Sequence, residues 1–258
     1  MADILRVSGV AKSFAGVAAV TDATFEVEER SITALIGPNG AGKTTTFNVV
    51  SGSMPGDSGS LWYDGHDIGG LRAYQVARLG LMRTFQLPRV MVAMTVMDNL
   101  LLAGSDHPGE RLNGLLRVRT VRGTERQLRS RARELLDRVG LAEKAEEYGG
   151  ALSGGQRKLL ELARLLMARP RIVLLDEPLA GVNPALGLRL MQFIHKIRDE
   201  DGTTFLFIEH DIGAVMRNAD HVIVMAQGAV IARGRPADVR VDPAVVDAYL
   251  GTRRAVAP

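Results

Sequence analysis

Short apolar runs recur along the chain, and each ends at a polar or glycine-containing turn. Between them lie stretches in which apolar residues follow helical spacing. Compact apolar runs predict strands that are covered on both faces, and their alternation with helices favours an α/β fold with a mostly parallel sheet. The predicted buried strands are Ser31–Ile36, Arg171–Asp176, Thr203–Ile208 and His221–Ala226.

Near the start of the chain the pattern is different. Leu5–Val10 and Thr24–Glu28 alternate apolar and polar residues, which is typical of strands with one exposed face. Together with Leu61–Tyr63, these segments predict an antiparallel β subdomain beside the parallel core.

The middle of the chain lacks strand patterns and shows two apolar stripes at helical spacing. We expect one domain, in which residues 1–95 and 169–258 form the core and β subdomain and residues 96–168 an inserted α-helical subdomain. Glycines, a proline and a run of arginines from Arg117 to Arg133 interrupt the pattern, and we interpret the arginines as a solvated helix face rather than a phosphate-contacting patch. The stripes are Leu128, Ala132, Leu135, Leu136 and Val139, and Leu159, Leu162, Ala163 and Leu166.

Composition limits the possible functions. Hydrophobic residues make up 46% and charged residues 24% of the chain, which are ordinary globular values. The absence of cysteine excludes disulfides and cysteine-based metal sites, and a net charge of +3 does not call for nucleic acid. No signal peptide and no apolar stretch of about 18–20 residues, the length that crosses a bilayer, stands out. We therefore expect a cytoplasmic protein that reaches any membrane through a partner.

A glycine-rich stretch follows the first predicted buried strand and matches G-x-x-x-x-G-K-[ST]. Its glycines let successive N–H groups point inward at phosphate oxygens, at the start of a helix whose dipole favours the same anion. Lys43 is expected to reach the β- and γ-phosphates of ATP, and the Thr44 hydroxyl to hold Mg²⁺. The predicted nucleotide-binding residues are Gly37, Pro38, Asn39, Gly40, Ala41, Gly42, Lys43, Thr44 and Thr45.

Two carboxylates follow a second apolar strand, Ile172–Leu175. They lie at the carboxyl end of the strand, which is the edge of an open α/β sheet where ligands bind. We assign Asp176 to the metal and Glu177 to the general base that polarises a water for attack on the γ-phosphate.

A second anion-binding turn precedes the last apolar stripe. Ser153, Gly154, Gly155 and Gln156 open a helix with free N–H groups, a hydroxyl and a positive dipole end. A second anion site is surplus if the chain works alone. It has a use if this turn faces the γ-phosphate that is held by the phosphate loop of another subunit.

These motifs, in this order, resemble the ATP-binding-cassette (ABC) family over nearly the whole chain. The resemblance implies that Gln86, in Arg83-Thr-Phe-Gln, senses Mg²⁺ and the attacking water. It also implies that His210 contacts the γ-phosphate and helps to hold Glu177, and that Phe14 stacks on adenine. The loop Ala180–Pro184 departs from the commonest form, which carries Asp where Asn183 lies.

Finer details resemble the ATPase subunits of branched-chain amino acid importers. They are Leu81–Gln86, Ala180–Pro184, Ile208–Asp211, the ending Val246–Gly251 and the insertion Ser105–Arg126. The resemblance implies transmembrane permease subunits, a second ATPase subunit (an identical or a paralogous copy) and, indirectly, a periplasmic solute-binding protein. Met91 and Met94 are candidates for contact with the permease. Two alternatives stay open: an ATPase subunit for export of lipopolysaccharide, and a soluble ABC ATPase acting in iron–sulfur assembly or on nucleic acid.

Overall fold

The computed structural model describes residues 2–84, 90–104 and 118–254. The chain divides into two compact units. The first comprises Met1–Arg83, Arg171–Leu179 and Ile194–Pro258, and the second comprises Thr84–Pro170 and Ala180–Phe193. In the part of the chain that is described, no helix combines the length and the apolar character that crossing a membrane requires.

The first unit contains a ten-stranded sheet with the strand order β5-β4-β1-β2-β10-β9-β3-β8-β7-β6. One side of this sheet is antiparallel, as the alternating segments predict. Inward residues of these strands are buried and their neighbours exposed, so one face packs on a core. The antiparallel strands are β1 (Asp3–Phe14), β2 (Val17–Glu28), β4 (Ser58–Tyr63) and β5 (His66–Asp67).

The other side is mostly parallel. Every residue of β3 (Ile32–Ile36), β7 (Ile172–Asp176) and β8 (Thr204–Ile208) is buried, which confirms three of the predicted strands to within one residue at their starts. The fourth, β9 (His221–Ala226), has the predicted bounds. The sheet is completed by β6 (Leu81–Arg83) and β10 (Ala229–Gly234), and the latter runs antiparallel to β9.

The register of the parallel strands decides which loops meet. Leu35 of β3 pairs with Ile208 of β8, and Ile208 pairs with Asp176 of β7. The carboxyl ends of β3, β8 and β7 are therefore level. As a result, the segments that follow them, starting at Gly37, Glu177 and Glu209, leave the sheet at one edge.

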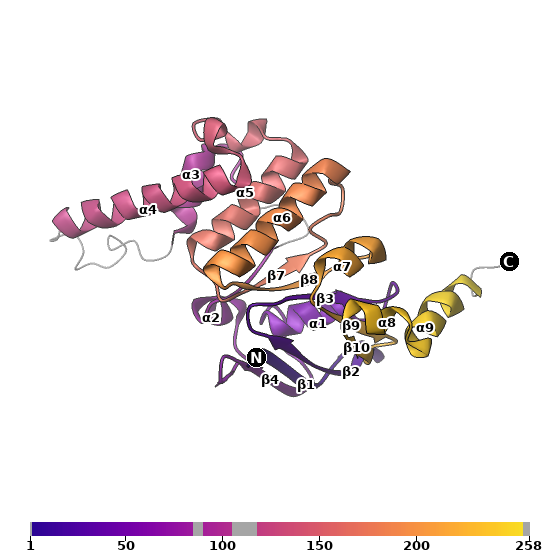
Figure 1. Cartoon of the computed structure of the whole chain (residues 1–258). Coiled ribbons are helices and arrows are strands. Elements are labelled where there is room, and N and C mark those ends of the chain that lie inside the picture. Colours follow the sequence, from indigo (N-terminus) through magenta and orange to yellow (C-terminus); the bar gives the residue numbers. More distant parts are fainter. Residues whose placement is uncertain (1, 85–89, 105–117, 255–258) are drawn as a thin grey trace. The chain divides into compact units, whose positions relative to one another are not determined.

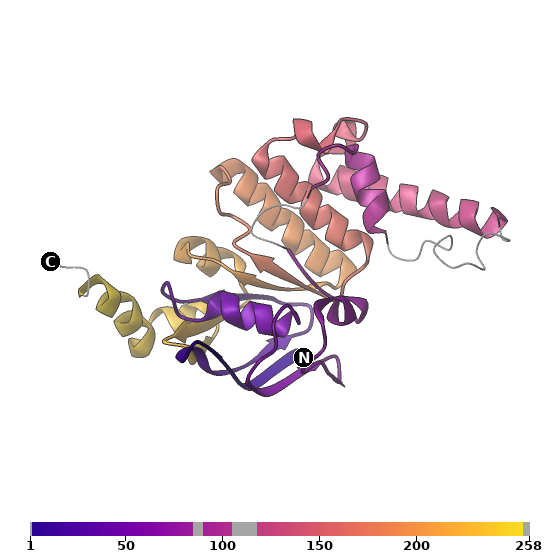
Figure 2. The same ribbon diagram turned by 180° about the vertical axis from the view of Figure 1, so that it is seen from behind.

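Helices flank the sheet of the first unit. Figure 2 shows α1 (Lys43–Val50) across one face, where Phe47 and Val50 join a buried cluster with Phe25 and Tyr63. The other helical segments of this unit are α2 (Ala73–Arg78), α7 (Ile212–Asn218), α8 (Pro236–Arg240), α9 (Pro243–Arg254) and the second half of α6 (Pro184–Asp201).

The second unit is helical. It consists of α3 (Val96–Ala103), α4 (Val118–Val139), α5 (Gly154–Met167) and the first half of α6, and α3, α4 and α5 pack on one another (Figure 1). The residues of both predicted stripes are buried, except Leu128, which is half-buried. The arginines do not interrupt the helix from Val118 onward, because arginine is a good helix former. Arg126, Arg129 and Arg133 are exposed along α4.

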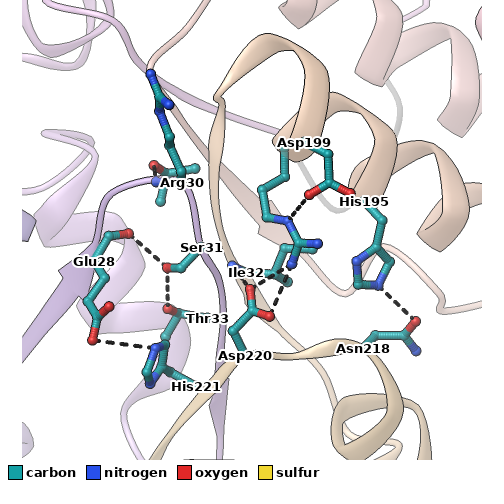
Figure 3. A network of polar contacts seen from close by, with 12 residues as sticks. Glu28, Arg30, Ser31, Ile32, Thr33, His195, Asp199, Asn218, Asp220 and His221 are labelled. Atoms are coloured by element: carbon teal, nitrogen blue, oxygen red, sulfur yellow. Dashed lines mark hydrogen bonds and ion pairs between the residues drawn. The ribbon is translucent and has the colours of Figure 1, made fainter. Parts of the chain in front are cut away.

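A polar network joins the amino ends of the parallel strands (Figure 3). One carboxylate oxygen of Asp220 accepts a hydrogen bond from the Ile32 amide at 2.8 Å, and Arg198 donates to both oxygens at 2.8 and 3.0 Å. Nearby, the buried Thr204 hydroxyl accepts from the Arg30 amide at 2.9 Å. These contacts satisfy backbone groups at the amino edge of the sheet with side chains of the same unit.

Candidate nucleotide-binding site

The loop between β3 and α1 curls because three of its glycines have positive φ. They are Gly37 at 150°, Gly40 at 79° and Gly42 at 97°. A Cβ at Gly37 would lie 2.0 Å from the Met225 carbonyl oxygen, and one at Gly42 would lie 2.5 Å from the Ala19 carbonyl oxygen. Both positions therefore require glycine for space as well as for conformation.

Lys43 is the first residue of α1 and is only 5% exposed. Its ammonium group donates to the carbonyl oxygens of Gly37 at 2.7 Å and Pro38 at 2.9 Å, so it lies over the loop. Burial lowers the pKa of Lys43, and the nearby Glu177 carboxylate partly opposes that shift. The strand register brings Glu177 to the same sheet edge as this loop, so the predicted base lies near the phosphate loop.

Glu177 is held in an uncommon backbone conformation, with φ at 49°. Its amide donates to the Ile208 carbonyl at 3.1 Å, and its carboxylate lies 2.8 Å from Nε2 of His210. The structure therefore brings the predicted base and the predicted histidine into direct contact. A carboxylate with an imidazole partner at the edge of a phosphate loop can orient and deprotonate a water.

Asp176 is anchored by a neighbour to which the sequence analysis gave no role. Arg83, the last residue of β6, donates to Asp176 Oδ2 at 2.8 Å and to Asn48 Oδ1 of α1 at 2.6 Å. The arginine and aspartate side chains are 11% and 2% exposed. A buried guanidinium that joins α1 to the acidic strand fixes the carboxylate relative to the phosphate loop.

The oxygen donors here suit Mg²⁺, which prefers hard ligands and keeps several waters. Thr44 is an exposed residue at the start of α1, and Asp176 supplies a carboxylate at the same edge of the sheet. Among the described residues there is no cluster of three or more acidic or histidine side chains that could hold a metal alone. Phosphate oxygens and water would have to complete the ligand set.

The second predicted anion site lies in the other unit. Ser153 is the N-cap of α5: its hydroxyl accepts from the Gln156 amide at 3.3 Å, and the Gln156 side chain accepts from the Ser153 amide at 2.9 Å. This capping box shapes the turn and leaves the amides of Gly154 and Gly155 at the positive end of the helix. A Cβ at Gly155 would lie 2.0 Å from Leu186, whereas one at Gly154 would meet nothing within 4 Å.

Of the remaining predicted residues, the structure describes Phe14 and Asn183 but not Gln86. Phe14 is 44% exposed at the end of β1, on the hairpin whose second strand contacts Gly42 through Ala19. Asn183 caps α6, because its side chain accepts from the Leu186 amide at 2.9 Å. Gln86 lies outside the described residues, as does most of the insertion Ser105–Arg126.

Two further residues contact the site, although the sequence analysis did not single them out. Glu209 accepts hydrogen bonds from the Leu179 and His210 amides. Tyr249 of α9 interacts with the backbone of Gly37, and burial raises its pKa. Glu209 could have been found from the sequence, because it is a carboxylate directly after a buried strand. Tyr249 could not, because its contact depends on how the end of the chain folds back.

A glycine-curled loop with a buried lysine, level with an acidic strand end and a histidine, is the arrangement of a P-loop nucleotide-binding protein. The family model described as ABC transporter matches residues 20–180, and the one described as branched-chain amino acid ATP-binding cassette transporter matches residues 229–255. The chain belongs to the ABC transporter family.

Individual relatives agree with the family match. The chain is 43% identical over 249 residues to BraF of Pseudomonas aeruginosa, a high-affinity branched-chain amino acid transport ATP-binding protein, with 96% of this chain and 98% of the relative covered. It is 40% identical over 249 residues to LivG of Salmonella typhimurium, described in the same words, with the same shares covered. The ADP conformation of MJ1267, an ATP-binding cassette of an ABC transporter, aligns with a TM-score of 0.83 at 36% identity and covers 97% of this chain and 100% of its own.

Proposed function

We propose that the chain is the ATP-binding and ATP-hydrolysing subunit of an importer for branched-chain amino acids or related small polar solutes. The observation that carries the proposal is the edge at which the phosphate loop, Asp176 and the Glu177–His210 pair meet. The relatives named above support the solute class.

In this proposal each group at the edge has a separate task. Lys43 exchanges its loop carbonyls for the β- and γ-phosphates, while the backbone N–H groups of the other loop residues, Pro38 excepted, surround the remaining oxygens. Thr44 and Asp176 would hold Mg²⁺, which would neutralise phosphate charge. Glu177 accepts the proton of the attacking water, and His210 keeps that carboxylate in place. Phe14 stacks on adenine, and Gln86 senses the metal and the water.

The turn Ser153–Gln156 acts in trans in this proposal. Two cassettes, identical or paralogous, bind two ATP molecules head to tail, and each turn contacts the γ-phosphate on the other subunit. The capping box supports this, because it prearranges amides for an anion without using the protein's own phosphate loop. Binding of ATP then closes the pair, and hydrolysis opens it.

The pair works on membrane subunits at the cytoplasmic face. Met91 and Val92 are exposed, at 40% and 54%, on a segment of the second unit that we propose receives a helix of the permease. Met94, the other candidate, is half-buried. A periplasmic solute-binding protein would deliver the solute to the permease.

Replacing Glu177 by Gln tests the hydrolytic role. The variant should bind ATP normally, lose turnover and accumulate as an ATP-dependent dimer, measured by phosphate release and by light scattering during gel filtration. Normal turnover in the variant would remove Glu177 from the role of general base.

A further inference from the structure

Glu209 is a buried carboxylate that connects two loops of the site. It follows β8 directly and is 4% exposed. One oxygen accepts a hydrogen bond from the Leu179 amide at 2.7 Å, and the other accepts from the His210 amide at 3.2 Å. Hydrogen bonds to an ionised acceptor are among the stronger ones in proteins, and both ends of this bridge are backbone groups.

The two amides belong to the segments that carry the base and the histidine. Leu179 lies two residues after Glu177, and His210 is itself the partner of Glu177, at 2.8 Å. A second bond joins the same segments, because the Glu177 amide donates to the Ile208 carbonyl at 3.1 Å. The turn after β7 is therefore attached to the end of β8 on both sides of Glu177.

Glu177 needs such an attachment. A glutamate at a φ of 49° is in the left-handed region, which costs about 1 kcal/mol or more and persists only where the surroundings impose it. The bridge through Glu209 imposes it from the Leu179 side. Without the bridge, the turn could relax and the Glu177 carboxylate would move relative to His210.

We propose that Glu209 is a positioning residue for hydrolysis, which holds the Glu177–His210 pair in its reactive geometry by clamping the two backbone segments that bear it. The inference rests on the proposed function, since it assumes that Glu177 is the base. Glu209 does not need to contact nucleotide, so its removal should affect turnover and not ATP affinity.

Asp220 provides a matched control at the opposite edge of the same sheet. The Asp220 carboxylate also accepts a backbone amide hydrogen bond, from Ile32 at 2.8 Å. Asp220 lies between the end of α7 and the start of β9, at the edge of the sheet. It has no contact with Glu177 or His210 among those described. Asp220→Asn should therefore lower stability and leave catalysis unchanged.

The experiment compares four variants of the full chain: Glu209→Gln, Glu209→Leu, Asp220→Asn and Glu177→Gln. Misplacement of a catalytic group by about 1 Å can cost about a hundredfold in rate. We expect kcat to fall about tenfold in Glu209→Gln, which keeps one acceptor, and about a hundredfold in Glu209→Leu, which keeps none. The KM for ATP and the affinity for a fluorescent ATP analogue should stay at wild-type values, and the ATP-dependent dimer should persist longer.

Thermal unfolding separates positioning from general stability. Glu209→Leu leaves the Leu179 and His210 amides without their acceptor and should lower Tm, as Asp220→Asn should, so kcat is compared at a temperature where all variants are folded. A loss of kcat in both Glu209 variants, with wild-type kcat in Asp220→Asn, supports the proposal. The inference about Glu209 would be overturned if both Glu209 variants kept the wild-type kcat, or if Asp220→Asn lost as much kcat as they do. Either result would leave the proposed function intact. Full turnover in Glu177→Gln would overturn the proposed function and this inference with it.

Discussion

The two edges of the parallel sheet carry similar polar groups but differ in how those groups are partnered. At the amino edge, Asp220 pairs with Arg198 and accepts from the Ile32 amide (Figure 3), and Thr204 accepts from the amide of Arg30, which itself has a φ of 57°. At the carboxyl edge, Lys43 donates to loop carbonyls that phosphate would replace, and Glu177 has a positive φ. Positive φ values occur at both edges, so the difference lies in the partners: the amino edge pairs its polar groups within the protein, whereas the carboxyl edge keeps exchangeable groups for a ligand.

This contrast implies that substitutions at the two edges should separate stability from function. Changes at the amino edge should lower the free energy of unfolding and leave nucleotide binding intact. Changes at the carboxyl edge should weaken nucleotide binding or hydrolysis and leave the free energy of unfolding unchanged, except where a residue also packs against its neighbours.

Gly37→Ala should have the largest effect, and it tests that exception. A methyl group would lie 2.0 Å from the Met225 carbonyl oxygen at a φ of 150°, so the loop and β9 must move apart. We expect a loss of about 3 kcal/mol in the free energy of unfolding together with lost ATP binding. Gly40→Ala is the control: nothing lies within 4 Å of its Cβ, so denaturant titration should show only the smaller conformational cost.

Lys43→Ala should separate the two properties most clearly. Loss of charged hydrogen bonds to phosphate should weaken ATP affinity about ten- to a hundredfold or more. Stability should not fall, because burial disfavours the charged ammonium and lowers its pKa. Titration with a fluorescent ATP analogue and scanning calorimetry measure the two quantities. Lys144→Ala is the control, because it removes a lysine that pairs with Glu147 away from the phosphate loop; ATP affinity and stability should both stay unchanged.

Thr204→Val should affect only stability. The fully buried hydroxyl accepts from the Arg30 amide, and valine leaves that amide without its acceptor. We expect a loss of about 1–3 kcal/mol in the free energy of unfolding with unchanged ATP affinity and kcat. A large loss of kcat in a folded Thr204→Val protein would contradict the separation of the two edges.

Tyr63→Phe should have the smallest effect at neutral pH. The Tyr63 hydroxyl is buried and has no hydrogen-bond partner among the described residues, and burial raises its pKa to about 12. Because the pKa is about 10 in the unfolded chain, the stability due to this group is complete below that pH and is lost as the pH rises toward 12. Urea titrations at pH 7 and 11 should show that the wild type loses more stability than Tyr63→Phe.

Much of the fold can be read from the sequence because burial of whole strands leaves a simple signal. The strands β3, β7, β8 and β9 are compact apolar runs, and the glycine pattern after β3 predicts the phosphate loop. By contrast, β10 is mostly half-buried, and its sequence contains no clear run of apolar residues. The apolar stripe predicts the part of α4 from Leu128 to Val139, but the arginines were expected to interrupt the helical pattern, and the structure shows one helix through them.

The details of the site are less readable. Asp176 and Glu177 are apparent as carboxylates after a strand, but the positive φ of Glu177 is not. The contact between Arg83 and Asp176 depends on pairing of β6 with β7, strands about 90 residues apart in sequence. Such contacts follow from topology, which local patterns do not encode.

We propose that each nucleotide site is completed by the Ser153–Gln156 turn of a second subunit. Gly154→Glu in the Glu177→Gln background tests it most directly, because nothing lies within 4 Å of a Cβ at Gly154 and the added carboxylate would repel phosphate. Light scattering with ATP should show a dimer for Glu177→Gln and a monomer of unchanged ATP affinity for the double variant. A double variant that still dimerises, or a monomer that loses ATP affinity, would contradict the account.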